Sequence, residues 1–111
     1  MFKMMLNVKE RINIGNFLPM QSDFLTMQIT KNIQDKLSIS NTEEKEIEFK
    51  KEVSAQNPRG TYRWNEKGLI DKEFDFSEIE KSLVWKLLKD LNDNNKIVIG
   101  LLSIYDKFSK I

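Results

Sequence analysis

Apolar residues recur at helical spacing in several stretches of the chain. One such stretch begins at Ser22 or Asp23, and a large apolar residue occupies every fourth position along it. Residues four apart lie on one face of an α-helix, so this stretch predicts a helix with one buried side. The residues of that side are Leu25, Ile29, Ile33 and Leu37, widened by Phe24.

The strongest helical pattern follows Ser77, which forms a capping box with Glu80. Its apolar residues cover roughly half of the helix circumference, at about 100° per residue. They are Ile79, Leu83, Val84, Leu87, Leu88 and Leu91. Since this stripe is centred between Leu83 and Leu91, the side chain of Trp85 is expected to point well off that centre. Either it is exposed as an interface anchor, or the hairpin or the first helix covers it.

A last helix is expected to end near Phe108. Its apolar stripe consists of Ile97, Leu101, Ile104, Tyr105 and Phe108. Where this helix starts is open, because the residues KIVIG at 96–100 also suit a short strand.

A short helix is expected near the N-terminus. Asn7 is a suitable N-cap with Glu10 three residues later, and Val8 and Ile12 give the helix an apolar side. Gly15 is placed to end it. The residues before it lack the continuous apolar stretch and the cleavage site of a signal peptide.

The middle of the chain changes to the two-residue period of β-strands. The tetrapeptide NPRG at 57–60 has the signature of a type I turn, so the residues on either side of it predict a β-hairpin. The segment KEFDF at 72–76 is a candidate third strand. The alternating positions are Val53 and Ala55 before the turn, Tyr62 and Trp64 after it, and Phe74 and Phe76 in KEFDF.

The length and composition fit one small globular domain. The chain has 111 residues, of which 40% are hydrophobic and 32% charged. With the predicted elements, this indicates a helix-rich α+β fold over residues 1–111. A β-hairpin or a short three-stranded sheet lies between the N-terminal and the C-terminal helices.

The composition also excludes several classes of chemistry. Cys and His are absent, which removes disulfides, thiol nucleophiles, Cys/His zinc sites and the commonest general base. The net charge of +1 makes a strongly basic nucleic-acid binder unlikely. No phosphate-binding loop or nucleophile elbow is present, and no apolar run is long enough to span a membrane. We expect no catalytic residue, metal site or cofactor.

Basic and aromatic residues alternate around the predicted hairpin. Such interleaving can hold phosphates while the rings stack on bases. The alternative is that the rings pack on the helices and the charges keep an edge strand soluble. The basic residues are Lys50, Lys51, Arg59 and Arg63, and the aromatic ones are Tyr62 and Trp64.

A short acidic helix is expected from Thr42 to Phe49, capped by Asn41 with Glu44 or by Ser40 with Glu43. Its carboxylates are expected to form a solvated face. Alternatively, they mimic phosphates and occupy a basic site on a partner. This helix also argues against a winged-helix DNA-binding protein, because it stands where a recognition helix would meet phosphates.

Three segments resemble small uncharacterised proteins carried by phages and prophages of low-GC bacteria. They are ERINIGNFLPMQSDFLTMQITKNIQDKLSIS at 10–40, TYRWN at 61–65 and LLSIYDKF at 101–108, which together span most of the chain. The resemblance implies a phage accessory role in the cytoplasm of the bacterial host. It supplies no active-site residues.

These observations favour a non-catalytic phage-type accessory protein that binds another protein. Its target would be a host or defence factor, including a CRISPR-type nuclease, which it would inhibit by steric or electrostatic blocking. The alternatives are a winged-helix-like DNA-binding protein and a self-associating virion part. The expected protein contacts are Trp85, Glu43, Glu44, Glu46, Tyr62 and Trp64. The DNA contacts of the alternative would be Lys50, Lys51, Arg59 and Arg63.

Overall fold

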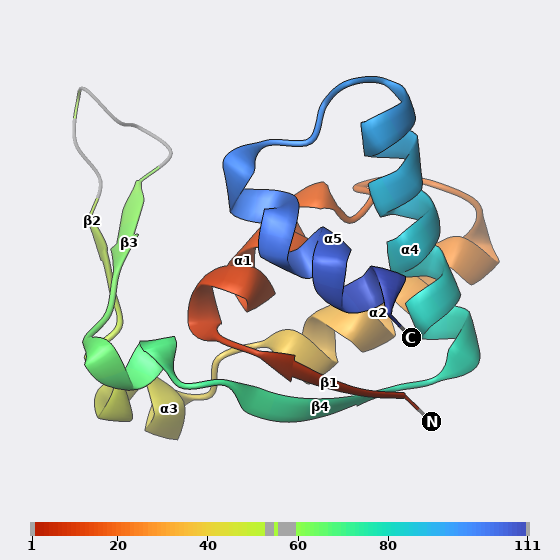
Figure 1. Cartoon of the computed structure of the whole chain (residues 1–111). Coiled ribbons are helices and arrows are strands. Elements are labelled where there is room, and N and C mark those ends of the chain that lie inside the picture. The colour runs from red at the N-terminus through yellow and green to blue at the C-terminus, as the bar shows by residue number, and fades with distance from the viewer. Residues whose placement is uncertain (1, 53–54, 56–59, 111) are drawn as a thin grey trace.

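The computed structural model describes residues 2–52, 55 and 60–110, and it has the mixed α+β class that the sequence predicts (Figure 1). The helices are α1 (Val8–Phe17), α2 (Phe24–Leu37), α3 (Asn41–Glu46), α4 (Glu78–Asp93) and α5 (Leu102–Ser109), with short 3-10 turns η1 (Glu66–Leu69) and η2 (Ile99–Leu101). The strands are β1 (Phe2–Leu6), β2 (Lys50–Glu52), β3 (Thr61–Arg63) and β4 (Lys72–Phe76).

The described strands form two separate antiparallel sheets. β2 pairs with β3, which confirms the hairpin, although residues 53–54 and the turn residues 57–59 lie outside the described part. KEFDF is a strand as expected, but β4 pairs with β1, from Phe2 opposite Phe76 to Leu6 opposite Lys72. The predicted three-stranded alternative is therefore wrong. The partner of β4 lies some seventy residues away along the chain, so no local sequence pattern predicts this pairing.

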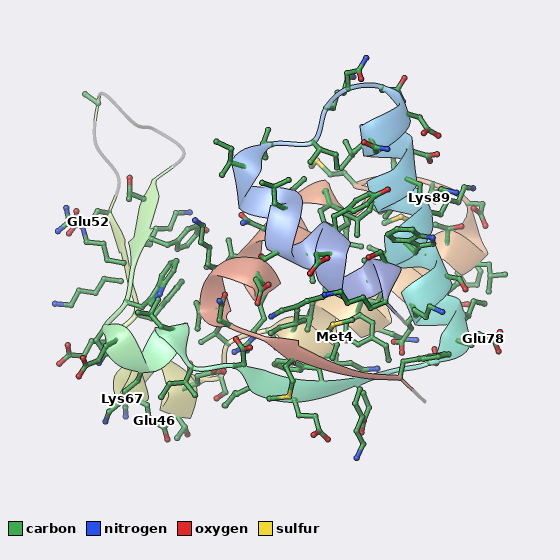
Figure 2. The ribbon with its side chains drawn as sticks, viewed as in Figure 1. Met4, Glu46, Glu52, Lys67, Glu78 and Lys89 are labelled. Carbon is green, nitrogen blue, oxygen red and sulfur yellow. The ribbon has the colours of Figure 1, made fainter. Side chains whose placement is uncertain are left out.

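The core lies between the β1–β4 sheet and the helices (Figure 1). Met4 and Leu6 of β1 face inward, as does Phe76 of β4, while the alternate residues face solvent (Figure 2 for Met4). The rings of Phe76 and Phe108 meet edge to face, with centroids 5.6 Å apart. Large buried residues of the helices complete this core: Ile14, Leu18, Ile33, Leu37, Val84, Leu88, Leu101 and Ile104.

The helical phases differ in detail from the predicted ones. In α4 the buried positions are Glu80, Val84 and Leu88, so the buried stripe is rotated toward Trp85 and Ile79 is exposed. In α2 the prediction for Ile33 and Leu37 is confirmed. Phe24 and Leu25, by contrast, lie exposed in the first turn, where no described element covers them.

One predicted helix boundary is corrected, and one that the sequence left open is decided. α1 continues through Gly15 and ends at Phe17, because Leu18 precedes Pro19 and takes the extended backbone that a following proline favours. The residues at 96–98 form neither helix nor strand, and the chain becomes helical from Ile99 onward. The caps at Asn7, Asp23, Ser40 and Ser77 are confirmed.

A buried ion pair joins α1 to α3. Arg11 and Glu43 are only 4% and 7% exposed, and the guanidinium contacts both carboxylate oxygens, at 2.5 and 2.9 Å. Arg11 also donates to the carbonyls of Leu37 and Ser38 at the end of α2, and it lies over the ring of Phe74. The expectation that Glu43 lies on a solvated face is therefore wrong, because the neighbouring helix supplies a buried cation.

Acid should destabilise the fold through buried glutamates. The hydrogen bond from Arg11 holds the pKa of Glu43 below its ordinary value of 4.5. For Glu80, burial raises the pKa, but hydrogen bonds from Lys36 and Ser77 outweigh it and leave the pKa lowered. A carboxyl with a lowered folded pKa contributes its full stability above its unfolded value and loses it as pH falls through the folded pKa. The urea concentration at the unfolding midpoint should therefore decrease as the pH is lowered below about 4.5.

The variant Glu43→Gln checks this cause. It leaves the Arg11 cation buried without its counter-charge, so we expect a loss of about 3–5 kcal/mol at pH 7. Its urea midpoint should also fall less on acidification than that of the wild type. An acid response identical to the wild type would contradict the assignment to Glu43.

The phase of α4 predicts unequal effects of two neighbouring leucines. Leu88 is fully buried, so Leu88→Ala should lower the free energy of unfolding by about 2–5 kcal/mol. Leu87 is only partly buried, so Leu87→Ala should cost clearly less. Equal shifts in urea midpoint for the two variants would contradict this phase.

Candidate functional site

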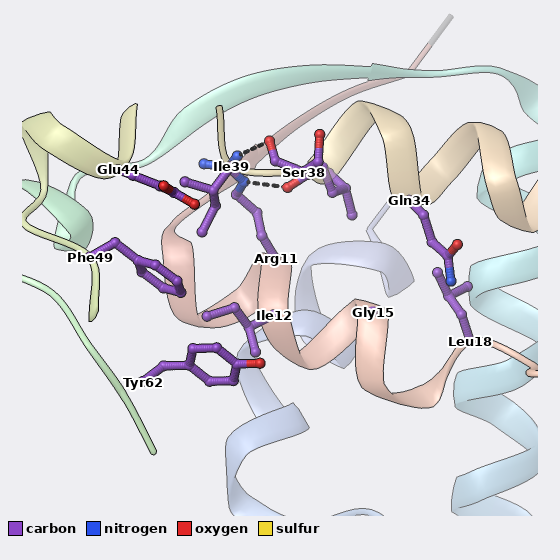
Figure 3. A pocket seen from close by; sticks show the side chains of 11 residues that line it. Arg11, Ile12, Gly15, Leu18, Gln34, Ser38, Ile39, Glu44, Phe49 and Tyr62 are labelled. Carbon is purple, nitrogen blue, oxygen red and sulfur yellow. Dashed lines mark hydrogen bonds between the residues drawn. The ribbon is translucent and has the colours of Figure 1, made fainter. Parts of the chain in front are cut away.

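A hollow of about 320 Å³ lies between α1, the end of α2 and the base of the hairpin (Figure 3). Phe49 and Tyr62 form one end of it, Leu18 and Gln34 line the other, and Ile12 and Gly15 of α1 lie between them (Figure 3). We call this the aromatic hollow. Most of the surface that lines it is apolar, and it opens to solvent.

Three stacked rings build the hairpin side of the aromatic hollow. The centroid of Phe49 lies 5.3 Å from that of Tyr62 and 6.3 Å from that of Trp64. Tyr62 and Trp64 thus lie on one face of β3 and its continuation, as the alternating pattern predicts. We call the β2–β3 hairpin the arm. A hydrogen bond from the backbone N–H of Asn65 to the carbonyl of Ile47, 2.7 Å long, closes its base.

Trp64 and Tyr62 have different surroundings. Trp64 is half-buried, and its ring lies so close to Gly68 that a Cβ there would stand 2.3 Å from Cδ1 of the indole. Its ring packs against Gly68 and Phe49 and so supports the arm, and it also lines a hollow between α1 and β3. Tyr62 is 40% exposed and borders the hollow, which leaves part of its ring available to a partner.

Gly15 keeps the floor of the aromatic hollow open. A Cβ at this position would meet nothing within 4 Å, so an added side chain would project into free space. The sequence pattern predicts Gly15 only as a helix terminator, and it indicates no site role for Ile12 or Phe49. An isolated glycine within a helical pattern was the available signal, because such a glycine costs stability and often has a packing reason.

The acidic residues are divided among different surroundings. Glu44 is exposed and lines the aromatic hollow near Phe49. Glu43 is turned inward to Arg11, so it is not available as a contact. Glu46 lies beside Lys67 at the foot of the arm, away from the hollow (Figure 2).

The basic residues of the hairpin are exposed. The Lys51 ammonium lies 5.6 Å from the centroid of the Tyr62 ring, and Arg63 pairs with Glu52 at 3.4 Å. Lys50 is exposed opposite Arg63. Arg59 lies outside the described residues.

Trp85 lies far from the hairpin. α4 and the arm occupy opposite sides of the molecule (Figure 1), so Trp85 does not join Tyr62 and Glu44 in one site. Its ring is half-buried and packs against Tyr105, with centroids 5.0 Å apart. Of the two open alternatives the partly covered one holds, but the cover is Tyr105 of α5 rather than the hairpin or the first helix, because the buried stripe of α4 is rotated toward Trp85.

The chemistry of the aromatic hollow is that of an apolar receptor. Its charged lining residues are Arg11, which is neutralised by Glu43, and Glu44 at the edge. Among the described residues, no group of three carboxylates is arranged to hold a metal ion. None of the described helices is both long enough and apolar enough to cross a membrane.

Two glycine-to-alanine changes should have opposite effects. In Gly68→Ala the new methyl group collides with Trp64, so we expect a loss of about 1–3 kcal/mol and a weaker near-ultraviolet signal of tryptophan. In the control, Gly15→Ala, the methyl group meets open space, and alanine should stabilise α1 by up to about 1 kcal/mol. Urea unfolding measures both, and equal midpoints would contradict this account of the arm.

Comparison with known proteins gives no match to this chain, whether with family models, with curated proteins or with solved structures.

Proposed function

We propose that this chain is a non-catalytic binding protein that receives an apolar side chain of a partner protein in the aromatic hollow. The observation that carries the proposal is a half-exposed tyrosine beside an apolar hollow whose floor is a glycine. The resemblance to phage accessory proteins supports the same class, with a host or defence factor as the target. Binding would act on the target by steric blocking.

The shape and chemistry of the hollow support a protein ligand. Protein interfaces are often centred on an aromatic residue that fills or borders a desolvated pocket, with polar residues around it. Tyr62 borders the hollow, and Gln34 and Glu44 supply polar groups at its edge. The volume is sufficient for one large side chain, since the side chain of a leucine or phenylalanine is smaller than the 320 Å³ hollow.

DNA binding by a winged helix has weaker support. The helix before the arm, α3, has only six residues, and its exposed side chains include Glu44 and Glu46. These carboxylates would repel phosphates. The exposed hairpin residues Lys50, Lys51 and Arg63 keep nucleic acid as an outcome that the experiment must separate.

The variant Gly15→Leu tests the proposal by filling the hollow. The tagged wild type is used to capture proteins from a bacterial lysate, with nuclease-treated and untreated samples in parallel. We expect a stoichiometric protein that survives nuclease and whose affinity falls at least tenfold in Gly15→Leu, equivalent to about 1.4 kcal/mol. Lys89→Leu, on the exposed side of α4 (Figure 2), is the matched control and should bind like the wild type.

Two results would contradict the proposal. One is a partner that binds Gly15→Leu, shown to be folded by circular dichroism, as tightly as it binds the wild type. The other is recovery of nucleic acid alone, lost as salt is raised through counterion release.

A further inference from the structure

The exposed face of α1 continues the binding surface beyond the aromatic hollow. A second hollow, of about 380 Å³, lies between α1 and β3, and the two hollows share Ile12 and Tyr62. A third, of about 270 Å³, lies between α1, Leu91 of α4 and the segment at 96–101. The second and third hollows share Asn13 and Asn16, so they flank these two residues on either side of α1.

The charge of this surface has one sign. Among the described residues, the only charged side chain that lines the second hollow is Lys9, and the only one that lines the third is Lys96. Both are exposed, and neither forms an ion pair within the described part of the chain. Lys36 and Lys107, by contrast, are paired with buried glutamates.

We infer that the partner segment that crosses α1 is an acidic polypeptide whose carboxylates pair with Lys9 and Lys96. This inference rests on the proposed function and names the chemistry of the ligand. Two unpaired cations on either side of one helix favour a ligand that carries negative charge at both ends of its contact. The exposed amide of Asn16, which lies between them, can hydrogen-bond the backbone of such a segment.

The apolar rim makes the ligand a polypeptide rather than a nucleic acid. Val98 is 61% exposed and Ile99 is 87% exposed, and both belong to the segment that borders the third hollow. Burying such exposed apolar side chains against a partner stabilises the complex. The phosphates and sugars of a nucleic acid provide little apolar surface for this. An acidic segment with interspersed apolar residues satisfies both the lysines and this rim.

A displayed library of random peptides provides the probe. Peptides selected on the wild type should be enriched in Asp and Glu together with apolar residues. The best selected peptide is then labelled, and its affinity is measured by fluorescence anisotropy. The double variant Lys9→Gln/Lys96→Gln should bind it at least tenfold more weakly and with a smaller dependence on salt.

The control is Lys86→Gln/Lys89→Gln, which removes two other exposed lysines of α4. Both line a different hollow, beside Trp85, and neither lines the second or the third hollow. It has the same net charge as the double variant, so a general effect of charge would weaken both equally. We expect the control to bind like the wild type. Equal losses in the two double variants would overturn the inference.

Three further outcomes would also overturn it. They are selection of basic or uncharged peptides, failure to select any peptide, and tighter binding of a labelled oligothymidylate that depends on Lys9 and Lys96. These outcomes are separable from failure of the proposed function. A captured protein that is sensitive to Gly15→Leu and insensitive to Lys9→Gln/Lys96→Gln would leave the proposed function standing without this inference.

Discussion

Three buried glutamates hold the helices of this fold together. Glu10, Glu43 and Glu80 each occupy the third position of a helix, and each pairs with a cation from a different helix. The pairs are Glu10 with Lys107, Glu43 with Arg11, and Glu80 with Lys36. A carboxylate at a helix start already interacts favourably with backbone amides and the helix dipole. The long-range cation completes its neutralisation, so each pair links a local cap to the tertiary structure.

The Arg11–Glu43 pair has the largest consequence for the candidate site. Arg11 donates to the carboxylate of Glu43 and also to the last carbonyls of α2, which fixes α1, α2 and α3 at one point. The arm starts directly after α3, and two-stranded hairpins are marginal alone in water. It therefore depends on α3 and on the stack of Phe49, Tyr62 and Trp64 for its position. The aromatic hollow is the space that remains between this arm and α1.

Pairing with buried glutamates distinguishes the cations that stabilise the fold from those that can still bind a ligand. The net charge of +1 gives no sign of a charged surface. Arg11, Lys36 and Lys107 are paired with buried glutamates. The charged residues that line the second and third hollows beside α1 are then Lys9 and Lys96, and no carboxylate is among their described lining residues. Of the acidic residues of α3, Glu44 and Glu46 remain exposed; Glu44 lines the aromatic hollow, and Glu46 lies beside Lys67. An acidic ligand over α1 and an apolar side chain beside Tyr62 are therefore compatible parts of one interface.

Elements whose signals are local can be predicted correctly from the amino-acid sequence. The caps at Asn7, Ser40 and Ser77, the hairpin and the helix that begins at Glu78 follow from hydrogen bonds and periodicities within a few residues. Other features become evident only in the folded chain. Glu43 is buried, and β4 pairs with β1. Trp85 packs on Tyr105, whereas Tyr62 borders a hollow. Each of these depends on a partner far away along the chain. A carboxylate, a strand edge or an aromatic ring has the same local pattern whether or not such a partner reaches it.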